Sequence, residues 1–188
     1  KYGHIDIVRL LMAAGASAQY ENINDGSTAL SLAVENDHTD VVKVLLAAQA
    51  DVNHVTADRW SVLHIASAYG YADIVQLLLA HGADIDYVNN NNGMTALHLA
   101  SKAGCTDIVR LLLADKAEVN QVDINGVNAL ILASADGHIE IVKLLLAKNV
   151  YIDHIDNDGE TALLSAVQNG HRNIVKLLLD YGANVRCE

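Results

Sequence analysis

Histidine is the residue of this sequence with the widest chemical repertoire, because an imidazole can bind a metal ion or exchange a proton near neutral pH. The chain contains nine histidines. Four of them occupy equivalent positions of a recurring segment, namely His4, His38, His138 and His171. Ligands of one metal ion must converge on it, and residues a whole segment apart are too distant to do so. The spacing therefore predicts structural histidines and no metal site.

The nucleophilic side chains also lack a catalytic pattern. No Gly-x-Ser-x-Gly turn, phosphate-binding glycine loop or His-Glu-x-x-His pair occurs in the sequence. Cys105 and Cys187 lie far apart and form no ligand-spacing motif, which is typical of free thiols in a reducing compartment. We therefore expect a protein that is not an enzyme, needs no cofactor and resides in the cytoplasm, with the nucleus as the alternative.

Charge and hydropathy restrict the class of partner. The net charge of −11 disfavours binding to nucleic acid or to anionic membranes and favours a basic or neutral partner. No stretch approaches the roughly 18 apolar residues of a membrane-spanning helix, so we expect no membrane insertion. Proline is absent, which argues against a flexible linker inside the chain. These features predict a single domain over residues 1–188.

The chain is organised by a segment that returns at intervals of 33 or 34 residues. At its centre is an apolar pair that ends in leucine, at Leu30, Leu63, Leu97, Leu130 and Leu163. The residue three positions after each of these leucines is alanine, which indicates a close contact where nothing larger fits. A fixed period of this length is typical of stacked structural repeats.

Each segment carries the signals of two short helices and a projecting turn. A turn with Asp-Gly or Asn-Gly opens four of the five segments, and a residue that can cap a helix follows it. These capping residues are Thr28, Ser61, Thr95, Asn128 and Thr161. The first helix ends near a glycine in four segments, and the second helix carries an acidic first turn and an Ile-Val-x-Leu-Leu-Leu pattern.

These motifs resemble the ankyrin repeat. The resemblance rests on Gly-x-Thr-x-Leu-His at Gly93–His98, on Gly-His at Gly137 and Gly170, on Ile-Val-x-Leu-Leu-Leu and on Ala-Asp-Val-Asn. It implies an all-α solenoid of helix–turn–helix units with projecting β-hairpin loops. Two departures stand out. Ala or Val replaces the family's usual proline before the central leucine, and two hairpins carry an extra residue, near Tyr20–Ile23 and within Asn89–Asn92.

The period predicts about five full repeats and a partial N-terminal one. We place them at residues 1–22 (partial), 23–55, 56–89, 90–122, 123–155 and 156–188. The chain begins in the middle of a unit at Lys1, and its last unit is as apolar as the internal ones. Terminal repeats normally expose a polar face. We therefore expect residues 1–188 to be a slice of a longer protein with flanking repeats or domains, and to form a monomeric array.

The positions that vary between repeats are the candidates for partner binding. In ankyrin repeats, the residues beside the turn glycine and the last residues of the first helix face the concave groove. The resemblance therefore implies a partner-binding set of Glu35, Asp58, Arg59, Trp60, Tyr69, Met94, Lys102, Val127, Asp136 and Glu160. The residues after the turn form a central apolar stripe flanked by acidic residues. The alternative is that Trp60 folds back onto Tyr69 as packing.

Arg59 is unusual because it replaces the turn glycine that the other four segments keep. Either this turn changes type, or it holds arginine at positive φ, at a cost of about 1–3 kcal/mol. A position that breaks the rule of its own repeat is expected to be functional or strained.

Three functions are compatible with this pattern. The first is a protein–protein interaction module that binds a partner protein or peptide in the groove. The second is a structural spacer or scaffold that holds other domains apart. The third, which ranks last, is a small-ligand site in which a nucleotide base stacks on Trp60 beside Arg59 and Lys102. Independently, Asn53 and Asn120 resemble the hairpin asparagines of ankyrin repeats that an asparaginyl hydroxylase modifies; the simpler alternative is that they close the hairpins.

Overall fold

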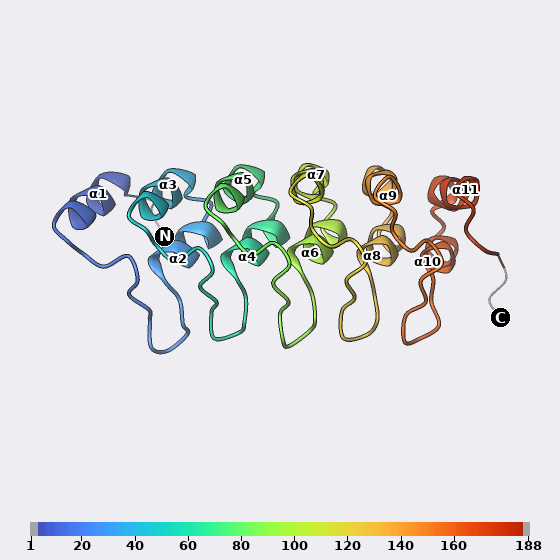
Figure 1. Cartoon of the computed structure of the whole chain (residues 1–188), viewed down its shortest axis with the longest axis horizontal. Coiled ribbons are helices and arrows are strands. Elements are labelled where there is room, and N and C mark those ends of the chain that lie inside the picture. The colour runs from blue at the N-terminus through green and yellow to red at the C-terminus, as the bar shows by residue number, and fades with distance from the viewer. Residues whose placement is uncertain (1–3, 186–188) are drawn as a thin grey trace.

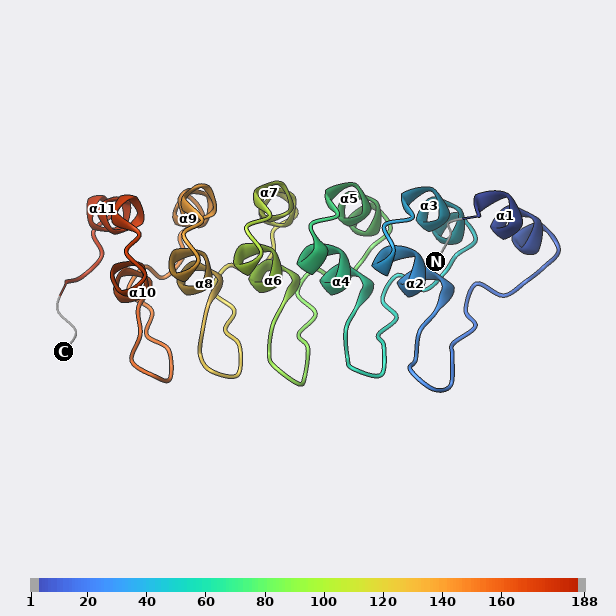
Figure 2. The same cartoon turned by 180° about the vertical axis from the view of Figure 1, so that it is seen from behind.

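The structure, a computed structural model, describes residues 4–185 of the 188-residue chain. Within this range the chain forms eleven α-helices in two rows, with a row of hairpins below them (Figure 1). The outer row comprises α1 (Ile5–Ala13), α3 (Thr39–Ala47), α5 (Ala72–Ala80), α7 (Thr106–Ala114), α9 (Ile139–Leu146) and α11 (Arg172–Asp180). The inner row comprises α2 (Ala29–Glu35), α4 (Val62–Tyr69), α6 (Ala96–Lys102), α8 (Ala129–Ala135) and α10 (Ala162–Gln168). The view from behind shows the same order, and the predicted all-α solenoid is confirmed (Figure 2).

The predicted capping residues begin all five inner helices. In each case the side-chain oxygen of the cap accepts a hydrogen bond from the backbone N–H three residues later, which satisfies one of the free donors of the first turn. In α2 and α6 the bond is reciprocated, because Ser31 and His98 bond back to the amides of Thr28 and Thr95. A short helix that buries one face needs such a defined start, and the sequence supplies it in every repeat.

The core runs without interruption through the stack. The five central leucines are buried, and the alanines three residues later are at most 4% exposed. These alanines are Ala33, Ala66, Ala100, Ala133 and Ala166. Each inner helix packs against its neighbours in the inner row, one for α2 and α10 and two for the others, and against the outer helix that follows it. Full burial of one leucine side chain contributes about 1.5–3 kcal/mol, so the stack is held by the sum of many such contacts between neighbours.

The hairpins confirm the two predicted insertions. The bond that closes each hairpin joins residues four positions apart at Thr56 and Trp60, with N···O 3.0 Å. It joins residues five positions apart at Asn22 and Ser27 (2.8 Å) and at Asn89 and Met94 (3.0 Å). The additional residue therefore lies inside the turn that this bond closes.

The histidines of the Gly-His pairs connect successive repeats. The Nε2 atom of His138 lies 3.1 Å from the carbonyl oxygen of Lys102, and that of His171 lies 2.9 Å from the carbonyl oxygen of Ala135. Each imidazole thus bonds the end of the inner helix of the preceding repeat. The histidines of the hairpins act similarly, since His54 Nε2 lies 2.7 Å from the Gly26 carbonyl oxygen.

The two ends of the stack expose apolar side chains. No inner helix precedes α1 among the described residues, and Ile7, Leu10 and Leu11 are all more than half exposed. At the other end, Val167 of α10 is 54% exposed. Over residues 4–185, no helix is long and apolar enough to cross a membrane.

Candidate protein-binding site

The predicted partner-binding residues lie in the angle between the hairpins and the inner helices. We call this surface the inner groove; one wall is made by the residue after each hairpin turn, and the other by the last residues of α2, α4, α6, α8 and α10. The first wall runs through Ser27, Trp60, Met94, Val127 and Glu160. Of these five, Ser27 is buried and the other four are half-buried.

Side-chain oxygens hold the first wall in place. The backbone N–H of Ser27 donates to Asp25 Oδ1 at 2.9 Å, and that of Trp60 donates to Thr56 Oγ1 at 3.3 Å. Met94, Val127 and Glu160 are bonded in the same way by Asn92, Asp123 and Asp156. These bonds fix the backbone of the inner groove at each hairpin turn.

The indole of Trp60 is half-buried and packs on its inner side against His64. The two ring centroids are 5.8 Å apart and the rings are nearly perpendicular. The ring of Tyr87 contacts His64 in the same edge-on manner, at 5.5 Å. One part of the indole thus belongs to the core, while the remainder faces the groove.

Tyr69, the last residue of α4, is 63% exposed and stacks on Tyr71 with centroids 5.7 Å apart. The turn between them is made by Gly70, which closes α4 in the left-handed conformation at φ 82°. The aromatic neighbour of Tyr69 is therefore Tyr71, and that of Trp60 is His64. The alternative in which Trp60 folds onto Tyr69 differs from the structure, in which each of the two rings contacts another ring.

Trp60 and Tyr69 both line a cavity of about 310 Å³ between the first two complete repeats. We call it the Trp60 cavity. Its lining residues come from two hairpins and two inner helices: Asp25, Ser27, Leu32, Glu35, Thr56, Asp58, Trp60, Ile65, Ala68 and Tyr69. Four of the ten predicted residues, Glu35, Asp58, Trp60 and Tyr69, are thus brought together in one place.

Sequence reasoning missed Leu32, Thr56 and Ile65 as lining residues of this cavity. Helical spacing could have found two of them. Leu32 precedes Glu35 by three residues and Ile65 precedes Tyr69 by four, so each shares a helix face with a predicted residue. Thr56 carries no such signal, because its place in the cavity follows from the bond to Trp60 that closes the turn.

The remaining predicted residues lie outside the Trp60 cavity. Lys102 and Asp136 are exposed at the ends of α6 and α8, and Met94 and Val127 continue the hairpin wall. Glu160 Oε1 accepts a hydrogen bond from Gln168 Nε2 at 2.9 Å, which joins a hairpin to α10. The predicted set therefore extends over several repeats, with the Trp60 cavity near one end.

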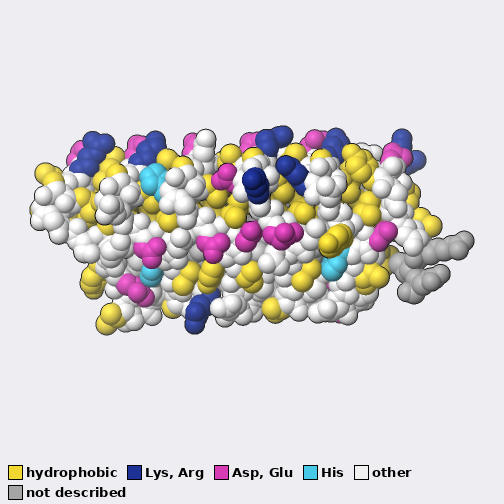
Figure 3. Space-filling view, viewed as in Figure 1, with side chains coloured by type: hydrophobic (Ala, Val, Ile, Leu, Met, Phe, Trp, Pro, Cys, Tyr) yellow, Lys and Arg dark blue, Asp and Glu magenta, His cyan; other side chains and the backbone are white. Residues whose placement is uncertain are grey.

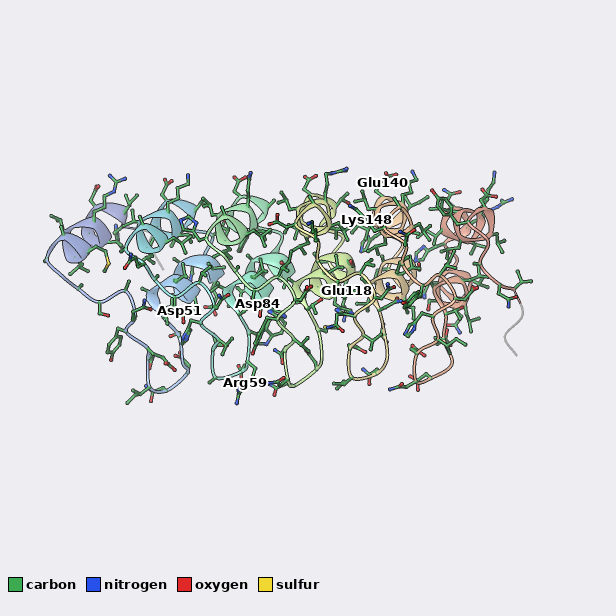
Figure 4. The ribbon with its side chains drawn as sticks, in the orientation of Figure 1. Asp51, Arg59, Asp84, Glu118, Glu140 and Lys148 are labelled. Atoms are coloured by element: carbon green, nitrogen blue, oxygen red, sulfur yellow. The ribbon has the colours of Figure 1, made fainter. Side chains whose placement is uncertain are left out.

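Arg59 occupies the turn in the left-handed conformation, at φ 63°. The second of the two predicted alternatives is therefore correct: the turn keeps its type and arginine takes the place of glycine. Figure 4 shows Arg59 at the tip of its hairpin, extending away from the helices. It is not among the residues that line the Trp60 cavity.

The next hairpin explains how Arg59 is accommodated. At three other turns, a backbone N–H of the following hairpin bonds the carbonyl of the residue before the glycine, as Ile124 does with Asn92 at 3.2 Å. A Cβ atom on Gly93 would approach Ile124 N to 2.6 Å. Beside Arg59, the carbonyl of Asp58 is bonded by the side chains of Asn89 (3.4 Å) and Asn91 (3.1 Å). At this turn, side chains of the next hairpin therefore replace the backbone N–H that makes the bond at those three turns. The arginine at position 59 and the residue inserted in the next hairpin thus occur at the same contact.

Asn53 and Asn120 connect the junctions of neighbouring repeats. Asn53 donates to the Gly82 carbonyl at 3.2 Å and accepts from the Asp84 amide at 2.7 Å. Asn120 accepts from the Tyr151 amide at 2.8 Å. Both asparagines therefore have a structural role, because each one bonds its own repeat to the next.

Acidic side chains are distributed unevenly over the molecule. Figure 3 shows a row of them on the face where the outer helices join the hairpins. Figure 4 places Asp51, Asp84 and Glu118 along this level. Their oxygens accept bonds from nearby backbone amides, as Asp51 Oδ1 does from Asn53 at 2.9 Å, so they stabilise the junctions. In the Trp60 cavity, the bond from Ser27 holds the pKa of the Asp25 carboxyl below its usual value.

The comparisons with known proteins agree with this geometry. No curated protein was found to match the chain. A family model described as ankyrin repeats (3 copies) matches residues 1–56, 49–123 and 115–188. These matches leave no part of the sequence uncovered, and the chain therefore belongs to the ankyrin repeat family.

Proposed function

We propose that this chain is a protein-binding module that holds a segment of a partner protein in the inner groove. Ankyrin repeats in general are protein–protein interaction modules. The observation that carries the proposal is the Trp60 cavity. Two aromatic side chains, Trp60 of the hairpin and Tyr69 of α4, line this cavity together with exposed carboxylates. Tryptophan and tyrosine are the residues most often responsible for the binding energy of an interface.

The charge of the groove supports a basic or neutral partner. The cavity lining contains three carboxylates, Asp25, Glu35 and Asp58, and no lysine or arginine. Asp136 and Glu160 continue this character along the groove, on a chain whose net charge is −11. Such a field accelerates the approach of a positively charged partner and disfavours an acidic one.

The experiment compares partner capture by the wild-type chain, Tyr69→Ala and Tyr151→Ala. The two tyrosines are equally accessible, at 63% and 67%, but Tyr151 lies in a junction outside the groove. We expect capture from cell extract to be lost with Tyr69→Ala and kept with Tyr151→Ala, while circular dichroism shows that both variants are folded. Trp60→Ala is expected to weaken binding by about 2 kcal/mol.

Equal capture by the wild type and Tyr69→Ala would place the binding site on another surface. Unfolding of Trp60→Ala would show that the indole is a core residue; for that reason Tyr69, which is the more exposed, carries the primary test.

A structural spacer is the second candidate, and the exposed apolar side chains at both ends of the stack favour it. In that case the ends would contact other domains and the groove would stay empty. A nucleotide site at Trp60 is disfavoured, because three carboxylates would repel the phosphates and Arg59 does not line the cavity.

A further inference from the structure

We propose that the Trp60 cavity receives one arginine side chain of the partner segment. This inference rests on the proposed function and specifies the chemistry of its anchor. It is drawn from the shape of the cavity, from the pairing of aromatic and acidic walls, and from the absence of a competing cation in its lining.

The size of the cavity suits a single long side chain. Its volume of about 310 Å³ lies at the lower limit of small-molecule pockets, which have volumes of roughly 300–1,000 Å³. Three of the lining side chains are apolar: Leu32 comes from α2, Ile65 from α4, and the indole of Trp60 from the hairpin. An extended aliphatic stem can lie along these surfaces while its polar end reaches the rim.

The rim supplies negative charge from three directions. Asp25 and Asp58 belong to two successive hairpins, and Glu35 is the last residue of α2. Among the described residues, none of these carboxylates is engaged in an ion pair. The bond from the Ser27 amide lowers the pKa of Asp25, which favours the charged form of that carboxyl. Three carboxylates without a counter-ion form a site for a cation.

Arginine fits this combination better than lysine. A guanidinium is planar and stacks on aromatic rings, and it donates in a fork that matches carboxylate oxygens. Trp60 and Tyr69 provide the rings, and the acidic rim provides the acceptors. The ammonium of lysine is a compact, strongly hydrated charge that gains less from stacking.

The test uses Trp60 itself, because it is the only tryptophan of the chain and its fluorescence reports on the cavity. The probes are four acetylated and amidated glycine–serine peptides that differ only in the central residue: arginine, lysine, citrulline or norleucine. Each is titrated to millimolar concentrations into the wild-type chain. We expect a saturable change with the arginine peptide, binding at least about tenfold weaker with citrulline, which keeps the shape but loses the charge, and lysine between the two.

A matched pair of variants localises the effect. Asp58→Asn removes one charge from the rim, and Asp115→Asn removes one from the exposed C-terminal end of α7 in the outer row. We expect Asp58→Asn to weaken the arginine peptide several-fold and Asp115→Asn to leave its affinity unchanged. Equal weakening by both variants would show a general charge effect and overturn the assignment of the cavity.

Two further outcomes separate this inference from the proposed function. If Tyr69→Ala abolishes partner capture but the citrulline peptide binds as well as the arginine peptide, the arginine anchor is wrong and the groove remains the binding site. If the norleucine peptide binds as tightly as the arginine peptide, the cavity selects only an apolar stem, and the arginine anchor is refuted while the proposed groove remains.

Discussion

The imidazole of His64 joins two repeats through both of its ring nitrogens. Nδ1 lies 2.7 Å from the hydroxyl of Ser61, the cap of its own helix, and Nε2 lies 3.0 Å from the carbonyl oxygen of Met94 in the next hairpin. Since a carbonyl only accepts, Nε2 carries the proton and Nδ1 accepts from serine. Burial lowers the pKa of His64, and the same cause lowers that of His98. Both rings are therefore neutral in the folded chain.

This burial makes stability depend on pH. Because the folded pKa values lie below the ordinary value of 6.5, the unfolded chain takes up protons first as the pH falls. The contribution of the neutral rings is complete above pH 6.5 and is lost progressively below it. As the pH is lowered below that value, we expect the free energy of unfolding to fall progressively, with a contribution from each of the two histidines. Urea unfolding at neutral and mildly acidic pH measures this change.

Two variants identify the residue responsible. His64→Asn should reduce the dependence of unfolding on pH, whereas His81→Asn, at an exposed position after α5, should leave it as in the wild type. An unchanged dependence in His64→Asn would exclude His64 as the source.

At the scale of the elements, the contact between glycine and histidine determines how closely two repeats approach. Gly104 adopts φ 73°, and a Cβ atom there would lie 2.6 Å from the ring of His138. Gly82 adopts a similar φ of 83°, but a Cβ atom would meet nothing within 4 Å. The two glycines therefore share the backbone requirement and differ only in the neighbour.

Substituting both glycines by alanine separates these two contributions. We expect Gly82→Ala to lower the free energy of unfolding by about 1 kcal/mol, the cost of a left-handed residue with a side chain. Gly104→Ala should lower it by about 2 kcal/mol or more, because the displaced ring of His138 also loses its bond to Lys102. Denaturant unfolding of the two variants gives the difference. Equal losses would mean that the ring moves aside without cost.

Most of the elements could be predicted because each depends on local chemistry. The capping residues from Thr28 to Thr161 need only a side-chain oxygen before the helix, and the central leucines need only an apolar side chain at a repeated position. Both features can be read from the sequence. The site was harder, because the Trp60 cavity depends on the spacing of two repeats and on which rings meet. The bond between Asn89 and the carbonyl of Asp58, beside Arg59, was also hidden, since the two residues belong to different hairpins and a single repeat contains no sign of their contact.

At the scale of the whole molecule, each repeat is stabilised by its contacts with the neighbouring repeats. The local stability of the helices should therefore be lower at the ends of the stack than in the middle. None of the residues of α1 is buried, whereas Ile108, Val109, Leu112 and Leu113 of α7 are buried between α5 and α9. In a stack of this kind, each repeat is stabilised by its interfaces, and a helix with one interface opens more readily than a helix with two. We expect the amides of α1 to exchange with deuterium well before those of α7, as hydrogen exchange followed by mass spectrometry would measure.

Accordingly, Leu112→Ala should cost about 2–5 kcal/mol of unfolding free energy, while Leu10→Ala, 71% exposed on α1, should change it by no more than about 0.5 kcal/mol. Equal exchange in the two helices would mean that the stack opens as one cooperative unit, and the groove would then be as rigid at its ends as at its centre.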